Sequence, residues 1–450
     1  MAYLGNTPTT QSFISGTDYF NGTGSQTAFT LSRTVASIND IQVTVNNVVQ
    51  QPNDAYTISG TTLTMTSAPS SGTNNVYVRY LSTTTQAITP SQGTVSWNTL
   101  DSNIQQDLGV MGKNRIINGN MVISQRGTSS FTAADNLYTL DRWVCAVNPA
   151  SKFTVIQSSD APAGFNNSLL VTSSSAYTVG AAEYETIVQR IEGYNIADLG
   201  FGTASAKTIT ISFWVKSSLT GSFGAAITNL GETRCYPFSY TINTANTWEQ
   251  KSVTIPGDTS GSWGTTNSTG INLYISLGTG SNLSGTANAW TSSAKVQPTG
   301  SVSVVGTNGA TWYITGVQLE VGTQATTFTT AGGSYGAELM LCQRYFQTWL
   351  KGTGTGTLPY WGTSGGGTTG IEGGFVLLQQ MRATPTYTIN ALELYDGGAS
   401  TYAVTGVTNL GSSNQCPRLA FSVASGLTSN RLYYVLPINS TAYFFASAEL

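Results

Sequence analysis

The residues best suited to acid–base chemistry are a pair of glutamates near the middle of the chain. Glu183 and Glu185 lie two apart in a segment that alternates like a β-strand, and Glu192 follows shortly afterwards. Residues i and i+2 of a strand share a face at roughly 7 Å, and paired carboxylates are what glycoside hydrolysis requires. Isolated pairs of this kind are also common on outward strand faces, where water solvates them. The pattern therefore favours solvated surface charges over a hydrolase.

The chain offers few other groups for catalysis or metal binding. It contains no histidine, so a serine nucleophile would lack its usual proton acceptor. Glycine patterns at residues 278–280 and 352–356 lack the lysine of a phosphate-binding loop and indicate turns or linkers. The cysteines are too widely spaced for a zinc site or a disulfide framework, and we expect mostly buried, free thiols at Cys145, Cys235, Cys342 and Cys416. We expect no enzyme activity, no cofactor and no metal.

Aromatic side chains in polar loops are the remaining candidates for chemistry. Trp263 and Trp290 lie in Gly/Ser/Asn-rich segments, and Tyr360 and Trp361 interrupt the most Gly/Thr-rich stretch of the chain. Sugars stack their C–H faces on such rings, while their hydroxyls pair with short polar side chains. The alternative for each ring is packing into a core or a subunit interface. These four residues are our candidate glycan-binding residues.

The elements that must position these residues are almost all strands. The 9 Trp, 22 Tyr and 16 Phe supply enough apolar area for folded cores, whereas a net charge of −3 argues against nucleic acid and anionic membranes as partners. No apolar run approaches the ~20 residues that span a bilayer, so we expect no membrane insertion.

The pattern along the chain predicts an all-β protein with short connecting helices. Residues 1–82 predict a small antiparallel β domain with a tight turn at Asn46–Asn47, and residues 83–112 a linker with a short helix. Strand signals from Met121 to Leu319 predict a jelly-roll β-sandwich over 113–330. Residues 331–350 predict an amphipathic helix with Ser334 as N-cap, and residues 351–450 a C-terminal β domain.

Two parts of the sequence resemble known families. Residues 24–31, 41–49, 54–58 and 76–81 resemble the N-terminal attachment domain of short-tailed (T7-like) phage tail fibres. That resemblance implies docking to tail adaptor or nozzle proteins and assembly as a homotrimer. Residues 114–121, 141–143, 211–216 and 315–322 are similar to a carbohydrate-binding-module-type jelly roll of phage structural proteins. The chain departs from T7-like fibres in having no long helical shaft, which puts a long rod in doubt.

The resemblances imply a phage tail fibre that is synthesised in the host cytoplasm and located in the virion tail. Its N-terminal domain would attach to the tail, and its distal domains would bind a host surface receptor, most simply a glycan. Two alternatives remain open. A capsid-decorating or head-fibre protein could use the same β domains, and a tail-borne glycan hydrolase would require Glu183 or Glu185.

Overall fold

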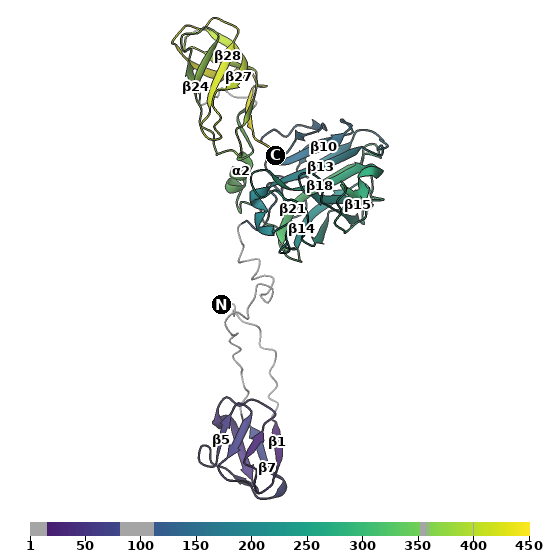
Figure 1. Cartoon of the computed structure of the whole chain (residues 1–450), viewed down its shortest axis with the longest axis vertical. Helices are drawn as coiled ribbons and strands as arrows, with labels where there is room; N and C mark the ends of the chain where they lie inside the picture. The colour runs from purple at the N-terminus through teal and green to yellow at the C-terminus, as the bar shows by residue number, and fades with distance from the viewer. Residues whose placement is uncertain (1–15, 82–111, 352–357, 359, 399) are drawn as a thin grey trace. The chain divides into compact units, whose positions relative to one another are not determined.

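The computed structural model describes residues 16–81, 112–351, 358, 360–398 and 400–450. The fold is all-β, with 43% strand and 5% helix, which confirms the expected class (Figure 1). The chain divides into two compact units, Met1–Leu100 and Asp101–Leu450, and each is described by itself. The short helix expected within residues 83–112 lies outside the described residues, apart from residue 112, which is in a turn.

The N-terminal unit consists of two small antiparallel sheets around one core. The predicted Asn46–Asn47 turn is confirmed, because both residues have positive φ (50° and 68°) and join β3 to β4. The core contains Val43, Leu63 and Val78. One sheet has the order β1 (Thr17–Gly22), β7 (Gly72–Tyr80), β3 (Ile41–Val45) and β4 (Val48–Val49), and the other β2 (Ala28–Thr30), β6 (Thr62–Met65) and β5 (Tyr56–Ser59).

Two six-stranded antiparallel sheets form the β-sandwich of the second unit. The apolar residues that alternate along β14 (Ile209–Ser217), which are Ile209, Ile211, Phe213 and Val215, all belong to the core between the sheets, and each is at most 2% exposed. The first sheet has the order β16 (Cys235–Ile242), β15 (Gly221–Thr228), β18 (Thr269–Thr279), β13 (Tyr184–Glu192), β10 (Trp143–Asn148) and β9 (Leu137–Tyr138). The second has the order β17 (Glu249–Ile255), β14 (Ile209–Ser217), β21 (Thr311–Val321), β12 (Ser168–Ser173), β11 (Phe153–Ser158) and β8 (Phe131–Thr132).

One expected strand is absent from the sandwich. Residues 121–123 form an irregular segment, although their sequence predicts a strand. The Asn118 side chain forms hydrogen bonds with both backbone groups of Ile123. It accepts from the Ile123 N–H at 3.0 Å and donates to the Ile123 carbonyl at 2.8 Å. A side-chain amide therefore replaces the neighbouring strand that a sheet would supply.

The helix predicted over 331–350 is shorter than expected. Ser334 is its N-cap, as predicted, but α2 spans only Tyr335–Gln343, and the chain continues as strand β22 (Phe346–Lys351). β22 pairs with β30 (Tyr443–Ser447), so a long-range ladder overrides the helical spacing of the apolar residues. The prediction is thus wrong for residues 346–350.

A closed six-stranded barrel makes up most of the C-terminal region (Figure 1). Its strands follow the order β23 (Trp361–Thr363), β24 (Gly370–Gly374), β28 (Arg418–Val423), β27 (Thr401–Asn409), β26 (Leu392–Tyr395) and β29 (Leu432–Pro437). A three-stranded sheet accompanies it, in the order β22, β30 (Tyr443–Ser447) and β25 (Thr386–Asn390). Buried side chains such as Tyr360, Phe421 and Phe444 form its core.

A buried ionic cluster connects the last residues to the sandwich. The Glu449 carboxylate accepts from Arg126 at 2.8 Å and also from Arg142. The Arg142 side chain is 1% exposed, and its guanidinium lies 3.6 Å from the centroid of the Tyr345 ring. Burial opposes the charge of Arg142, but Glu449 and smaller contributions from Tyr345, Tyr138 and Cys342 together outweigh burial and raise the pKa of the guanidinium. The cluster holds Arg142 as a charged group inside the protein.

Candidate functional site

A cleft of about 250 Å³ lies on the face of the first sandwich sheet that is turned away from the core. We call it the Tyr184–Tyr274 cleft. Strands β10, β13 and β18 supply its floor, and the segments before β9, after β15 and around residues 283–296 supply its rim. Its lining residues are Asp135, Asn136, Ala146, Tyr184, Arg190, Glu232, Tyr274, Leu283 and Val296.

Strand alternation places the two tyrosines on the outer face. Tyr274 lies directly opposite Val188 in the pairing of β13 with β18, while the neighbouring pair Ile187 and Ile275 is buried in the core. Tyr184 lies four residues before Val188, and both tyrosines pack against the small outer cluster that contains Val188. Two aromatic rings from strands far apart in sequence thus meet in one concave surface.

Polar groups in the cleft are held by hydrogen bonds to one another. The Tyr274 hydroxyl donates to Glu232 at 2.6 Å. Arg190 donates to the Asn136 side-chain oxygen at 2.7 Å, and Asn136 in turn donates to Asp135 at 2.9 Å. Asn136 and Glu232 both have positive φ, 57° and 52°, a conformation that Asn tolerates and Glu rarely adopts. The rim therefore holds donors and acceptors in fixed positions.

The electrostatics of the cleft keep both phenols protonated at neutral pH. Burial, together with the charge of Glu232, raises the pKa of Tyr274 far above the usual value of a phenol. Burial also raises the pKa of Tyr184, and the charges of Asp135 and Glu232 add to the shift. Two aromatic faces, hydroxyl groups, carboxylates, an amide and a guanidinium in one cleft suit a ligand with apolar faces and many hydroxyls.

The structure buries Trp263, one of the candidate glycan-binding residues. Trp263 is 8% exposed, and its ring lies 4.9 Å from Phe201 and 5.7 Å from Trp290. Trp290 is partly buried in the same cluster, where its indole N–H donates to the Pro256 carbonyl at 2.9 Å. The prediction of a binding role is therefore wrong for Trp263. Its loop is rich in polar residues, but the loop folds back on the sandwich, and the ring packs into the core.

Tyr360 and Trp361 lie on opposite sides of the barrel wall. Tyr360 is 1% exposed, and its hydroxyl donates to the Leu419 carbonyl at 2.7 Å, so the prediction of a binding role is wrong for this residue. Trp361 is 63% exposed and remains available to a ligand. Successive residues of a strand point to opposite faces, which explains why two adjacent aromatics have opposite environments.

Glu183 and Glu185, the pair that the hydrolase alternative requires, and the nearby Glu192 have separate environments. Glu183 accepts from the Tyr177 hydroxyl and the Gly180 N–H, both at 2.6 Å, and these bonds lower its pKa. Glu192 accepts a two-point contact from Arg344 at 2.7 and 3.0 Å. Glu185 is fully buried without a hydrogen-bond partner, and burial raises its pKa to about 8. Glu185 is thus neither a solvated surface charge nor accessible to a polymer.

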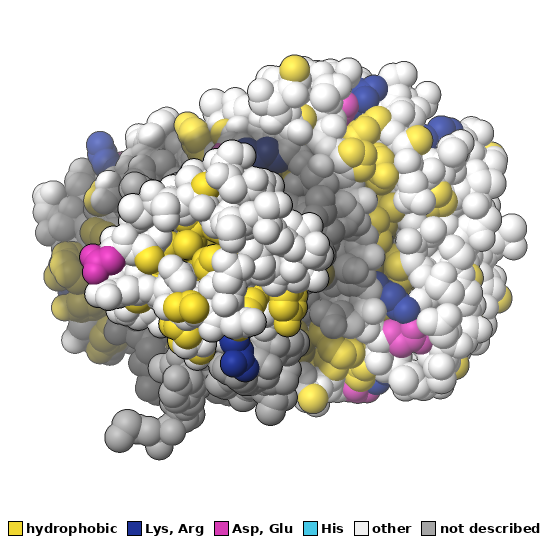
Figure 2. All heavy atoms as spheres, turned by 90° about the horizontal axis from the view of Figure 1, so that it is seen from below, with side chains coloured by type: hydrophobic (Ala, Val, Ile, Leu, Met, Phe, Trp, Pro, Cys, Tyr) yellow, Lys and Arg dark blue, Asp and Glu magenta, His cyan; other side chains and the backbone are white. Residues whose placement is uncertain are grey.

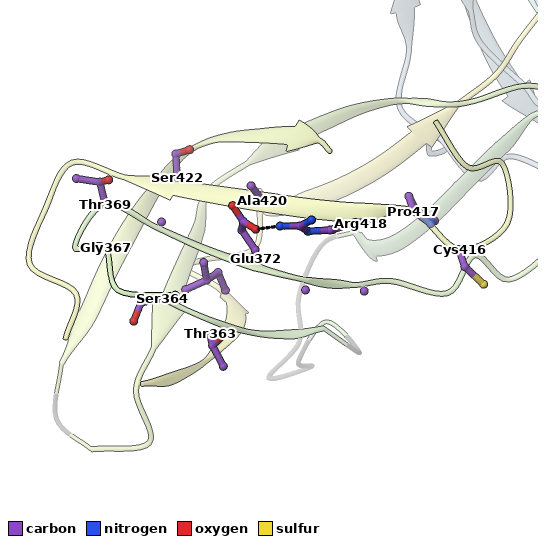
Figure 3. A pocket seen from close by; sticks show the side chains of 15 residues that line it. Thr363, Ser364, Gly367, Thr369, Glu372, Cys416, Pro417, Arg418, Ala420 and Ser422 are labelled. Atoms are coloured by element: carbon purple, nitrogen blue, oxygen red, sulfur yellow. Dashed lines mark hydrogen bonds and ion pairs between the residues drawn. The ribbon is translucent and has the colours of Figure 1, made fainter. Parts of the chain in front are cut away.

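A second hollow, of about 740 Å³, lies along strands β24 and β28 of the barrel (Figure 3). Gly370, Gly373 and Gly374 line it and contribute no side chains. Glu372 and Arg418 point toward one another in the hollow and form an ion pair (Figure 3). We call this hollow the glycine groove.

Charged side chains are sparse elsewhere on the surface. The face seen in Figure 2 carries few dark blue or magenta groups among polar and apolar ones, as the composition predicts. Among the described residues, no three Cys, Asp or Glu side chains come close enough together to hold a metal ion. No helix in the described part of the chain is long and apolar enough to cross a membrane. Cys145, Cys235 and Cys342 are buried free thiols as expected, and Cys416 is an exposed one.

The cleft residues were not among the sequence-based candidates. Tyr184 and Tyr274 lie within segments predicted as strands, where an aromatic residue is ordinarily part of a core. A usable signal was the alternation itself, because Ile187, Ile191, Ile271 and Ile275 predict the inward face and leave Tyr184 and Tyr274 on the outward face.

Neither family models nor curated protein sequences match the chain. Several solved structures match part of it. The enzymatically active domain of tailspike protein 4 of bacteriophage CBA120 is 12% identical with a TM-score of 0.26, and the match covers 46% of this chain and 21% of the tailspike. A CBM4 structure is 14% identical with a TM-score of 0.24, over 46% of this chain and 99% of its own.

The family 11 carbohydrate-binding module from Clostridium thermocellum, solved with a β-1,3-1,4-mixed-linked tetrasaccharide, is a further match. It is 13% identical with a TM-score of 0.23, over 45% of this chain and 99% of its own. Because the identities and TM-scores are low, nothing about the function of the chain follows from these matches.

Proposed function

We propose that this chain is a phage tail fibre protein that binds a host surface glycan in the Tyr184–Tyr274 cleft. The observation that carries the glycan-binding part is the cleft itself, in which two partly buried aromatic side chains lie among fixed donors and acceptors. Sugars need this combination, because their C–H faces stack on rings while their hydroxyls require directed hydrogen bonds.

The proposal assigns glycan binding to the cleft and no hydrolysis of the bound glycan. Glu232 is already engaged by the Tyr274 hydroxyl, and the buried Glu185 does not reach a polymer. We therefore expect the protein to leave a bound polysaccharide intact. Size-exclusion chromatography of the polysaccharide after incubation with the protein measures this, and a shortened polymer would favour the hydrolase alternative.

The glycan-binding part is tested on a panel of purified bacterial O-antigen and capsular polysaccharides. We expect the full chain to bind at least one of them, and Tyr274→Ala to weaken that binding by about tenfold or more, as for a central aromatic contact. Tyr194→Ala is a matched control, because Tyr194 is 61% exposed and does not line the cleft. No binding by the full chain, or equal binding by Tyr274→Ala, refutes the proposal.

The tail-fibre part depends on the N-terminal unit, whose sequence resembles tail-attachment domains. Immunogold labelling of virions with antibodies against residues 17–81 is expected to mark the tail. Label on the head would support the capsid-decorating alternative. Light scattering of the purified chain is expected to give a trimer, and a monomer would count against the fibre assignment.

A further inference from the structure

Three aromatic residues occupy directly paired positions on the barrel. Trp361 of β23 lies opposite Tyr434 of β29, and Tyr434 lies opposite Tyr395 of β26. Because paired residues point to the same face of a sheet, the three side chains share one side. We call Trp361, Tyr434 and Tyr395 the aromatic row.

The aromatic row faces outward. Tyr433 and Leu394, which alternate with row residues along their strands, are fully buried in the barrel core. Trp361 is 63% and Tyr434 39% exposed, and Tyr395 is half-buried. Neighbouring strands lie about 4.8 Å apart, so three rings across three strands cover about 10 Å. This is the length of about two sugar units.

The glycine groove continues the surface beyond the aromatic row. Trp361 precedes Thr363 by two residues on β23, so both side chains lie on the outer face, and Thr363 lines the groove. A Cβ added at Gly374 would meet no atom within 4 Å, so open space lies over this position. The lining residues of the groove extend along β24 from Gly370 to Gly374 and along β28 as far as Ser422, which suits an extended chain molecule better than a compact one.

Charges border the aromatic row on both sides, and two of the acidic groups are paired with arginines. Glu372 and Arg418 form an ion pair in the glycine groove, and Asp396, next to Tyr395, pairs with Arg431 at 3.2 Å. Both arginines are largely exposed and retain free donor capacity, because a guanidinium has five N–H groups. The surface thus combines an apolar row with hydrogen-bonding groups at its ends, and Glu393, on the same face two residues before Tyr395, adds a single unbalanced negative charge that does not favour an anionic partner.

We propose that the aromatic row and the glycine groove form a second binding site, for an extended neutral oligosaccharide. The inference rests on the proposed function and deepens it, since it gives the protein two glycan-binding surfaces within residues 101–450. Two sites on one chain can engage one polymer together, which strengthens attachment without a tight contact at either.

The test compares variants of the full chain on the same polysaccharide panel. Trp361→Ala, and separately Tyr434→Ala, are expected to weaken binding of at least one polysaccharide by about tenfold or more. Trp361→Phe is expected to retain part of the binding because it keeps a ring. Tyr194→Ala is the control again, since its exposure of 61% matches that of Trp361.

The outcomes separate this inference from the proposed function. If Tyr274→Ala weakens binding but Trp361→Ala and Tyr434→Ala leave every affinity unchanged, the cleft stands and the aromatic row is refuted. If the full chain binds no polysaccharide, both proposals fail. If Trp361→Ala alters the oligomeric state by light scattering and no affinity changes, the aromatic row is a contact between copies of the chain, and the inference is overturned.

Discussion

Replacing Glu449 by glutamine should destabilise the second unit far more than its place near the end of the chain suggests. The substitution keeps the size of the side chain and removes the charge that balances Arg142, which is 1% exposed. Arg126, whose side chain is 11% exposed, loses the same partner. Removing one partner of a buried ion pair typically costs about 3–5 kcal/mol, because the other charge remains buried.

Glu372→Gln supplies a matched control in the same unit. Glu372 and Arg418 form an ion pair whose side chains are 50% and 64% exposed, and exposed pairs contribute about 0–1 kcal/mol. The two substitutions are chemically identical and differ in burial. The difference between their free energies of unfolding should therefore be about 2–5 kcal/mol in favour of Glu372→Gln.

Urea denaturation followed by tryptophan fluorescence measures this difference. Eight of the nine tryptophans lie at position 143 or beyond, so the signal reports on the second unit. The cost of Glu449→Gln should change little with added salt, since ions do not screen a buried pair effectively. If both variants lose the same free energy of unfolding, the conclusion that Arg142 and Glu449 form a buried, stabilising pair is refuted.

Three further outcomes are expected. Leu63→Ala, in the core of the first unit and fully buried, should lower the free energy of unfolding of residues 17–80 by about 2–5 kcal/mol. Hydrogen exchange measures this, and unchanged protection of the buried amides of Val43 and Val78 would contradict the core position of Leu63. Burial raises the pKa of Glu185 to about 8, so between pH 4.5 and 8 the folded state binds more protons than the unfolded state, and stability falls as pH rises. Glu185→Gln should remove this fall, and urea midpoints at pH 5 and pH 8 that shift equally in both proteins would argue against it. Gly119→Ala should destabilise the sandwich strongly, since its Cβ would clash with the Val317 carbonyl oxygen, and an unchanged thermal midpoint would contradict that close approach.

The strands were predictable where apolar and polar residues alternate along the chain. The row Ile209, Ile211, Phe213 and Val215 is an example, because period-two spacing alone determines which residues share a face. The strand at residues 346–350 was not predictable, since Phe346 and Trp349 have helical spacing and only the ladder with β30 makes this segment a strand. Local pattern fails where a distant strand supplies the hydrogen bonds.

At the candidate site, too, local sequence pattern accounts for some features and long-range pairing for the others. Alternation requires that Tyr360 and Trp361 face opposite ways, but barrel closure decides that Tyr360 is the buried one. Tyr184 and Tyr274 are 90 positions apart in the chain, and only the pairing of β13 with β18 brings them to one cleft. A sequence limits what each side chain can do, whereas the long-range pairing of strands decides which side chains meet.

By itself, the sequence determined the all-β class, the scarcity of charge and the absence of histidine, since these depend on composition and short-range alternation alone. Only the tertiary structure decided that Trp263 belongs to a core cluster, that Glu185 is buried without a partner, and that Trp361, Tyr434 and Tyr395 lie in one row. The physical reason is that exposure and proximity are properties of the packed chain, in which each residue's neighbours come mostly from distant segments.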